Sequence, residues 1–182
     1  MRRLLLLSLS LLALGCDDPA PARPDAGSDG AVFIALQRDF EGFRDWTRFA
    51  VDSDAVPVGH PPGPSFIYVN RMPPEGVRRF PVGTILIKTI ESGSPQEWAI
   101  HGMVKRSSDF AATTGLIGWE LFELRFDDEE RPVILWRGEG PPSGMGYAAP
   151  IDGGIAELVC SDCHAAAWTN DSVLNEHTRL AY

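Results

Sequence analysis

Five consecutive residues near the C-terminus carry the most specific chemistry of this 182-residue sequence: Cys160, Ser161, Asp162, Cys163 and His164. Two thiols at this spacing lie about one helical turn apart, so each can add across a vinyl group of the same haem. The histidine that follows is then held at the iron as its proximal ligand. The motif therefore predicts a covalently attached haem c, with Cys160 and Cys163 as the attachment residues and His164 as the iron ligand.

Two other uses of the same cysteines stay open at the level of the sequence. A Cys-x-x-Cys pair in an exported protein can form a redox dithiol or a small disulfide. Together with His164 and His177, Cys160 and Cys163 could also hold zinc. Haem is the preferred interpretation, because a dithiol has no need of the adjacent histidine and a structural zinc site normally draws its ligands from two closed knuckles.

The third cysteine, Cys16, lies at the end of an N-terminal export signal. Residues 1–15 carry two arginines directly after Met1 and continue with an apolar run that is too short to span a bilayer. Cys16 then stands where bacterial lipoproteins carry their lipidated cysteine, although residues 13 and 14 are in the reverse of the usual order. A plain secretory signal is the alternative. We expect an exported chain, lipid-anchored through Cys16 on the periplasmic side of a bacterial membrane.

One folded domain follows this signal. Residues 16–30 are rich in Pro, Asp, Gly and Ala and poor in bulky apolar residues, which predicts a disordered tether. Residues 31–182 have the length of one ordinary domain and are enough to enclose a haem. The formal net charge of -9 argues against nucleic-acid binding and against electrostatic adhesion to anionic lipid. Membrane attachment would therefore depend on the lipidated cysteine.

The elements that must position the haem motif are expected to be mostly strands. Apolar residues recur every third or fourth position over residues 33–46, which predicts a helix. Strands are expected where β-branched and aromatic runs are bounded by turn residues. These runs are residues 65–69, 82–90, 98–105, 116–126 and 133–136. A short helix should carry the haem motif over residues 155–168, and residues 171–180 should add one or two turns.

This order of elements excludes two common monohaem architectures. Small electron-transfer cytochromes place the motif near the N-terminus and take an axial methionine from further along the chain, but no methionine follows His164. Four-helix cytochromes need long helices, which the prolines, glycines and β-branched runs in the middle of this chain do not allow. A mostly β haem c domain is the remaining architecture.

Several segments together show a resemblance to a known family. They are Phe43-Arg44-Asp45-Trp46, Phe66-Ile67-Tyr68-Val69, the strand from Phe80 to Lys88, Met103-Val104-Lys105, Gly118-Trp119-Glu120 and the late haem motif. The chain resembles the cytochrome P-460 and cytochrome c′-beta family of β-sheet c-type cytochromes. The Gly-Thr-x-x-x-Lys strand combined with the C-terminal Cys-x-x-Cys-His is the specific part of this resemblance.

The resemblance implies a fold, an assembly and a ligand. The fold is α+β and mainly antiparallel β: a single haem c domain with an N-terminal helix and a C-terminal haem-motif helix. The assembly is a homodimer. The haem is five-coordinate, and its open face binds hydroxylamine, nitric oxide or another small molecule.

Lys88 and His101 are the candidate catalytic residues under this resemblance. In the hydroxylamine-oxidising relatives, the lysine that ends this strand is bonded covalently to the haem macrocycle; the alternative for Lys88 is an ammonium reaching into water. His101 falls where those relatives carry a distal carboxylate, and strand alternation puts it on one face with Met103. An imidazole could accept the substrate protons instead, whereas an isolated strand histidine is otherwise a surface or core residue. His60 is a weaker candidate, at the pocket rim.

Three functions are compatible with the sequence. The first is an oxidoreductase that oxidises hydroxylamine and passes the electrons to a redox partner protein. The second is a binding protein for nitric oxide or carbon monoxide that performs no catalysis. The third is a simple electron carrier, which would need a sixth iron ligand. The candidates for that ligand are Met72, Met103, Met145 and a histidine.

Overall fold

The computed structural model describes residues 31–51, 62–107, 109–142, 147–151, 154–158 and 160–180. The expected signal at residues 1–15, the tether at residues 16–30, Cys16, His60 and Met145 lie outside these ranges. Within the described ranges, no helix combines the length and the apolar character needed to cross a bilayer.

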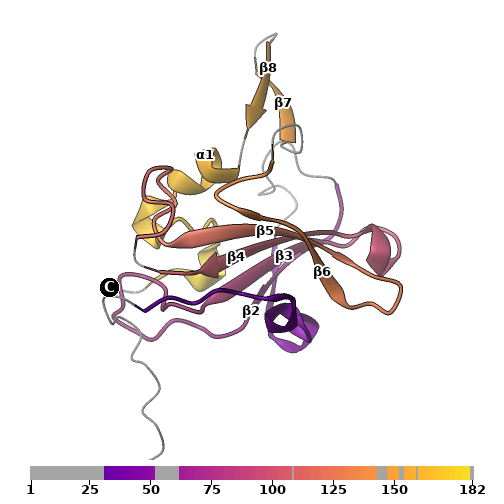
Figure 1. The fold of residues 1–182 in the computed structure, drawn as a ribbon, viewed down its shortest axis with the longest axis horizontal. Helices are drawn as coiled ribbons and strands as arrows, with labels where there is room; N and C mark the ends of the chain where they lie inside the picture. Colours follow the sequence, from indigo (N-terminus) through magenta and orange to yellow (C-terminus); the bar gives the residue numbers. More distant parts are fainter. Residues whose placement is uncertain are drawn as a thin grey trace, which may run out of the picture.

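Six strands form one antiparallel sheet in which each strand pairs with its neighbours in the sequence (Figure 1). They are β1 (Thr47–Val51), β2 (Ser65–Val69), β3 (Ile85–Ile90), β4 (Ala99–Lys105), β5 (Trp119–Phe126) and β6 (Pro132–Gly138). The expected mainly antiparallel β architecture is therefore confirmed. A separate hairpin of β7 (Tyr147–Ile151) and β8 (Gly154–Leu158) stands away from the sheet and leads to α1 (Cys160–Ala165).

The prediction of one N-terminal helix over residues 33–46 is wrong. The segment starts extended and then forms two short 3-10 helices, η1 (Gln37–Phe40) and η2 (Phe43–Asp45). Gly42 lies between them with φ +68°, a left-handed conformation that ends a helical turn. Apolar side chains three residues apart fit 3-10 turns as well as an α-helix. The strand β1, which follows directly, was not predicted.

The prediction of a helix over residues 155–168 is confirmed only for residues 160–165. Residues Gly154–Leu158 pair with β7 as a strand, and the helix begins only at Cys160. A short apolar run does not distinguish strand from helix by its periodicity. Between α1 and residue 180, the chain forms two single turns, η5 (Trp168–Asn170) and η6 (Glu176–Thr178), so the turn expected after residue 171 is confirmed. Another turn, η4 (Pro95–Glu97), precedes β4.

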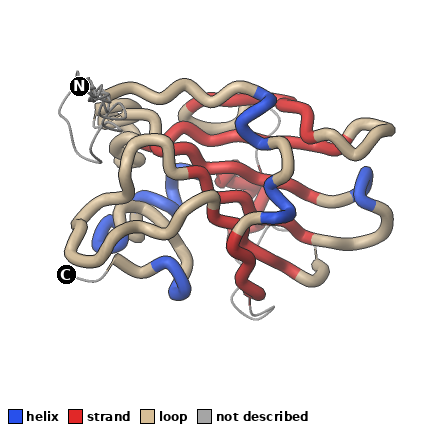
Figure 2. The backbone as a smooth tube through the Cα atoms, turned by 90° about the horizontal axis from the view of Figure 1, so that it is seen from below, coloured by secondary structure: helices blue, strands red, loops and turns tan. Residues whose placement is uncertain are grey.

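The two faces of the sheet are covered by opposite ends of the chain. Figure 2 shows η1 and η2 on the near side of the sheet, and Figure 1 shows α1 on the other side. We call these the N-terminal face and the C-terminal face. The core of the N-terminal face consists of Ala35, Phe40, Phe43, Tyr68, Ile85, Ile87, Ile100, Val104, Phe122, Leu124 and Phe126. The core of the C-terminal face consists of Val69, Phe80, Leu86, Met103, Ala111, Leu116, Trp119, Leu121, Trp136, Val173 and Leu180.

Candidate functional site

The cysteines of the haem motif lie on α1 over the C-terminal face. Cys160 is half-buried and packs against the core of that face, whereas Cys163 is exposed. Both are free cysteines, not partners in a disulfide. Burial raises the pKa of the Cys160 thiol, and the negative charge of Glu123 adds to the effect. The helix thus carries two thiols about one turn apart, and the first of them packs against the C-terminal face.

His164 is held by a backbone carbonyl. Its Nδ1 lies 2.9 Å from the carbonyl oxygen of Ser172, and a carbonyl can only accept, so the proton belongs on Nδ1. This assignment leaves the lone pair of the imidazole on Nε2. Burial lowers the pKa of His164, and the nearby positive charge of Lys88 lowers it further. The side chain is therefore a neutral imidazole with one nitrogen fixed and the other available to a metal.

A row of ionisable side chains crosses the C-terminal face near α1. The strand register pairs Lys88 on β3 with His101 on β4, and His101 with Glu123 on β5. Residues directly opposite each other in an antiparallel sheet point to the same side. The row continues to Ile67 at one end and Trp136 at the other, and both pack against the core of the C-terminal face. We call Lys88, His101 and Glu123 the charged row.

Lys88 is half-buried in this row. Removal from water lowers its pKa from the usual 10.5 to about 8. The positive charge of Lys88 also lowers the pKa of His164. At mildly alkaline pH a large part of the Lys88 population therefore carries a neutral, nucleophilic amine next to the haem motif.

Glu123 is a site residue that the sequence reasoning missed. One oxygen of its carboxylate, Oε2, accepts a hydrogen bond of 2.6 Å from the indole Nε1 of Trp136. A bulge between Glu123 and Leu124 shifts the register of β5 and β6, and bulges of this kind often re-aim side chains beside functional sites. One feature of the sequence could have identified Glu123: in the alternating pattern of β5 it shares a face with the apolar Trp119 and Leu121.

The turn that contacts His164 has an unusual backbone. Asp171 and Ser172 both have positive φ, +52° and +66°. Left-handed backbone costs a non-glycine residue roughly 1–2 kcal/mol, and two in succession persist only where the surroundings hold them in place. The carbonyl that fixes His164 thus belongs to a turn that other contacts must stabilise.

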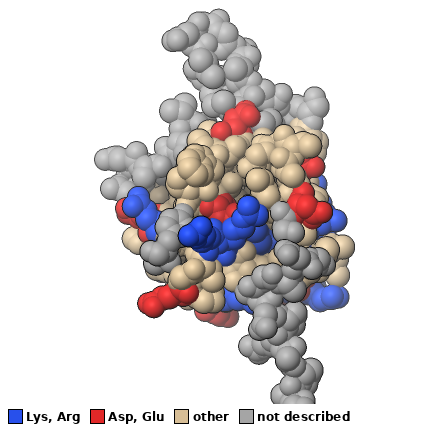
Figure 3. All heavy atoms as spheres, turned by 90° about the vertical axis from the view of Figure 1, so that its left-hand side faces the viewer, with Lys and Arg blue, Asp and Glu red and all other residues tan. Residues whose placement is uncertain are grey.

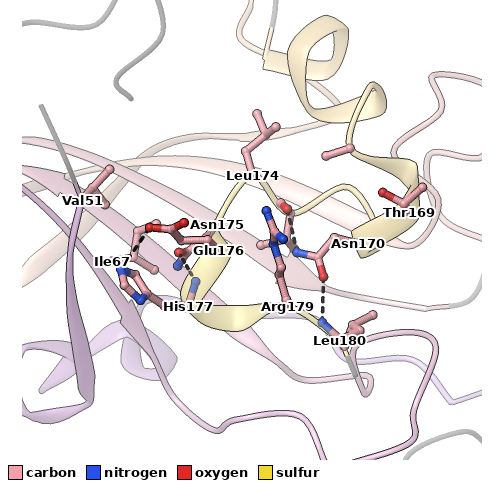
Figure 4. Close-up of a pocket in the computed structure, with 12 residues that line it drawn as sticks. Val51, Ile67, Thr169, Asn170, Leu174, Asn175, Glu176, His177, Arg179 and Leu180 are labelled. Carbon is pink, nitrogen blue, oxygen red and sulfur yellow. Dashed lines mark hydrogen bonds and ion pairs between the residues drawn. The ribbon is translucent and has the colours of Figure 1, made fainter. Parts of the chain in front are cut away.

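A cavity of about 770 Å³ lies beside the charged row (Figure 4). Ile67, which pairs with Lys88, lines it together with Val51 and side chains from the C-terminal segment, among them His177. The ring of His177 stacks on Phe49, with centroids 5.1 Å apart. His177 therefore belongs to the cavity wall, and among the described residues no group of three or more Cys, His, Asp and Glu is placed to hold a metal ion.

The surface charge is unevenly distributed despite the net charge of -9. Figure 3 shows lysine and arginine side chains gathered in the middle of the face that lies on the left of Figure 1. The loop between β2 and β3 alone exposes Arg71, Arg78 and Arg79. The overall acidity of the chain therefore does not describe every face of it.

Comparisons with protein-family models, with curated proteins and with solved structures found no match. The assignment to the cytochrome P-460 and cytochrome c′-beta family accordingly stays a prediction from the residues named above.

Proposed function

We propose that the chain is a c-type haem protein in which Cys160 and Cys163 attach the haem and His164 ligates the iron. The bond of 2.9 Å from His164 Nδ1 to the carbonyl of Ser172 is the observation that carries this proposal. It leaves the lone pair on Nε2 of a neutral imidazole, which is the tautomer and charge state that a metal needs. The two free thiols on the same helix are the groups that would form the two thioether bonds of haem c.

Within this class we propose the cytochrome P-460-like role, the oxidation of hydroxylamine or a similar small nitrogen compound. The haem, when bound, supplies a redox-active iron with an open coordination position. The protein supplies the charged row. Oxidation of hydroxylamine releases protons together with the electrons that pass to an acceptor protein, and His101 and Glu123 are the groups available to take those protons.

The charged row favours this role over simple gas binding. A protein that only holds nitric oxide or carbon monoxide has no need of proton acceptors and is served by apolar side chains. Here three ionisable residues stand in register on the face covered by α1, and Trp136 holds the carboxylate of Glu123 in one orientation. The partly neutral amine of Lys88 is also in the form that a covalent bond to the macrocycle, as the resemblance implies, would require.

Purified protein tests the proposal in two stages. Haem that survives a denaturing gel, together with a five-coordinate ferrous spectrum, is the expected result of the first. The second measures hydroxylamine-dependent reduction of an electron acceptor. Intact mass and tryptic mapping then show whether a Lys88 peptide carries haem as well as the Cys160–Cys163 peptide. Haem protein that binds nitric oxide but leaves hydroxylamine untouched would establish the gas-binding function instead, and sharp six-coordinate bands would establish an electron carrier.

We further propose that the protein is exported, anchored through lipid on Cys16, and dimeric. A mature lipoprotein carries several acyl chains, which suffices for stable anchoring. Cys16→Ser should therefore release the protein from membranes without changing its optical spectrum. Membrane association that persists in this variant would point to an uncleaved signal or an apolar surface on the folded domain.

A further inference from the structure

A buried ion pair between Lys105 and Asp171 connects the sheet to the turn that contacts His164. The Nζ atom of Lys105 lies 2.9 Å from one carboxylate oxygen of Asp171 and 2.8 Å from the other. The two side chains are only 2% and 7% exposed. Lys105 also donates to the carbonyl of Ile117 at 2.8 Å. Ion pairs this deeply buried contribute little net stability, because desolvation offsets their attraction, so this pair calls for another explanation.

Asp171 is held by three separate parts of the C-terminal face. Its carboxylate accepts from Lys105 on β4 and from the backbone N–H of Phe80, at 2.9 Å. Its carbonyl oxygen accepts from the indole Nε1 of Trp119 on β5, at 2.6 Å. Both ends of the residue are thus tied to the sheet or to the loop that precedes β3. This is the kind of surrounding structure that can maintain a left-handed backbone.

The contacts of Asp171 act directly on the residue that follows it. Ser172 has φ +66°, and its N–H donates to the carbonyl of Ala167 at 2.9 Å, which returns the chain to the end of α1. The carbonyl of Ser172 accepts from His164 Nδ1. A chain of contacts therefore runs from the sheet through Asp171 and the Ser172 backbone to the imidazole.

We propose that Lys105, Asp171 and Trp119 are positioning residues that hold the Ser172 carbonyl against His164 Nδ1–H. They fix which nitrogen of the imidazole is protonated, how the ring is oriented and how basic Nε2 is. Hydrogen-bond partners of this kind orient a metal-bound histidine and raise its basicity. The consequence for the iron rests on the proposed function, but the effect on the His164 tautomer does not.

Two variants remove the ion pair without introducing a residue type that the backbone of the turn excludes. Asp171→Asn keeps an oxygen for the Phe80 N–H, and asparagine tolerates positive φ. Lys105→Met combined with Asp171→Asn removes both charges, so neither charge is left buried alone. In ferrous haem protein we expect the iron–histidine stretching band to move to lower frequency in resonance Raman spectra. We also expect the midpoint potential to become more positive, because a weaker imidazole donor stabilises ferric iron less.

The N-terminal face provides a matched control. Arg137 and Glu120 form a bidentate ion pair there, with both N–O distances 2.7 Å and the Glu120 side chain 3% exposed. Arg137→Met with Glu120→Gln should alter stability but neither the stretching frequency nor the potential. An equal shift in this control, or unchanged values in a folded Lys105→Met/Asp171→Asn protein, would overturn the inference.

Whether wild-type protein is isolated with covalent haem tests the proposed function separately from this inference. Wild-type protein isolated without covalent haem would contradict the proposed function, and the same variants would then be compared in that protein. The ¹⁵N shifts of His164 should report the Nδ1–H tautomer in wild type and a mixed or Nε2–H population in the double variant. Identical tautomers in both would refute the positioning role, whereas a difference would support it without haem.

Discussion

The two faces of the sheet are covered by different kinds of side chain. On the N-terminal face, the ring of Phe43 packs against those of Tyr68 and Phe126, with centroids 5.2 and 5.7 Å away. On the C-terminal face, the corresponding space between sheet and covering segment holds the charged row and the haem motif. The first face is closed mainly by aromatic contacts, with the Tyr68 hydroxyl donating to Glu91 and the Arg44 guanidinium lying over the ring of Phe126. The second face places titratable groups where they are partly removed from water.

The ion pairs of the two faces also differ in what they connect to the sheet. Arg137 on the N-terminal face bonds Glu120 and the carbonyl of Ala35, so it fastens the extended N-terminal segment to the sheet edge. Lys105 on the C-terminal face donates a hydrogen bond to Asp171, which belongs to the turn beside His164. One pair closes a core, and the other connects the sheet to the turn beside His164. Under the proposed function, the chemistry would be confined to the C-terminal face, where a functional site departs from ordinary packing rules.

We predict that the covalent attachment of haem depends on residues of the C-terminal face alone. Cys160→Ala with Cys163→Ala should abolish haem that survives denaturation, because the two thioethers are the bonds that the motif offers. Haem staining on a denaturing gel measures this loss. His164→Ala should retain the stain and lose the native ferrous spectrum. Staining that persists without both thiols would mean that another residue, with Lys88 the first candidate, attaches the haem.

The charged row should control turnover. If the protein oxidises hydroxylamine, His101→Ala should slow it by roughly 10² to 10⁴, the usual contribution of a positioned general base. Glu123→Gln should act in the same direction. His101→Glu should recover part of the rate with a more acidic pH profile, since a carboxylate titrates below an imidazole. His177→Ala is the matched control on the cavity wall, and an equal loss there would exclude a specific role for His101.

The aromatic core of the N-terminal face should control stability instead. Phe43 is 1% exposed, and Phe43→Ala should lower the free energy of unfolding by about 3–5 kcal/mol because it leaves a cavity. Denaturant titration measures the change. Leu135→Ala, at a side chain that is 43% exposed, should change stability by less than about 0.5 kcal/mol. A folded Phe43→Ala protein should keep its haem spectrum; a changed spectrum would show that the faces are coupled.

The smallest expected effect is the pH dependence that Lys88 gives to stability. Folding lowers the pKa of Lys88 from 10.5 to about 8, so between those values only the unfolded chain holds the proton. The free energy of unfolding should therefore rise as pH increases through this window. Allowing for solvent screening of a half-buried amine, the rise should be about 1–2 kcal/mol.

The Cys160→Ala/Cys163→Ala protein is the suitable background for this measurement, because its Lys88 amine is not bonded to haem. Urea titrations from pH 7 to 11 should show the rise, and Lys88→Met should abolish it and raise stability at pH 7. His101→Ala should leave the rise in place. A Lys88→Met protein with the same pH profile as its parent would show that Lys88 lies in water.

The sequence by itself determined where β2 to β6 lie and which of their residues share a face. A period of two residues is a local property, so β2 and β4 lie where the apolar pattern predicts them, and His101 shares a face with Met103 as expected. The haem motif is also local, since its residues are adjacent in the chain. The same local reasoning fails for residues 33–46, where a spacing of three and four residues predicts one helix although Gly42 divides the segment.

Tertiary structure decided everything that depends on register. Lys88 meets His101, and His101 meets Glu123, only because three strands pair at particular offsets, and a slip of one residue would turn each side chain to the other face. Lys105 and Asp171 are 66 residues apart in the chain, and the carbonyl that fixes His164 belongs to a turn with two left-handed residues. No local pattern encodes such contacts, because their free energy arises from long-range pairing and burial.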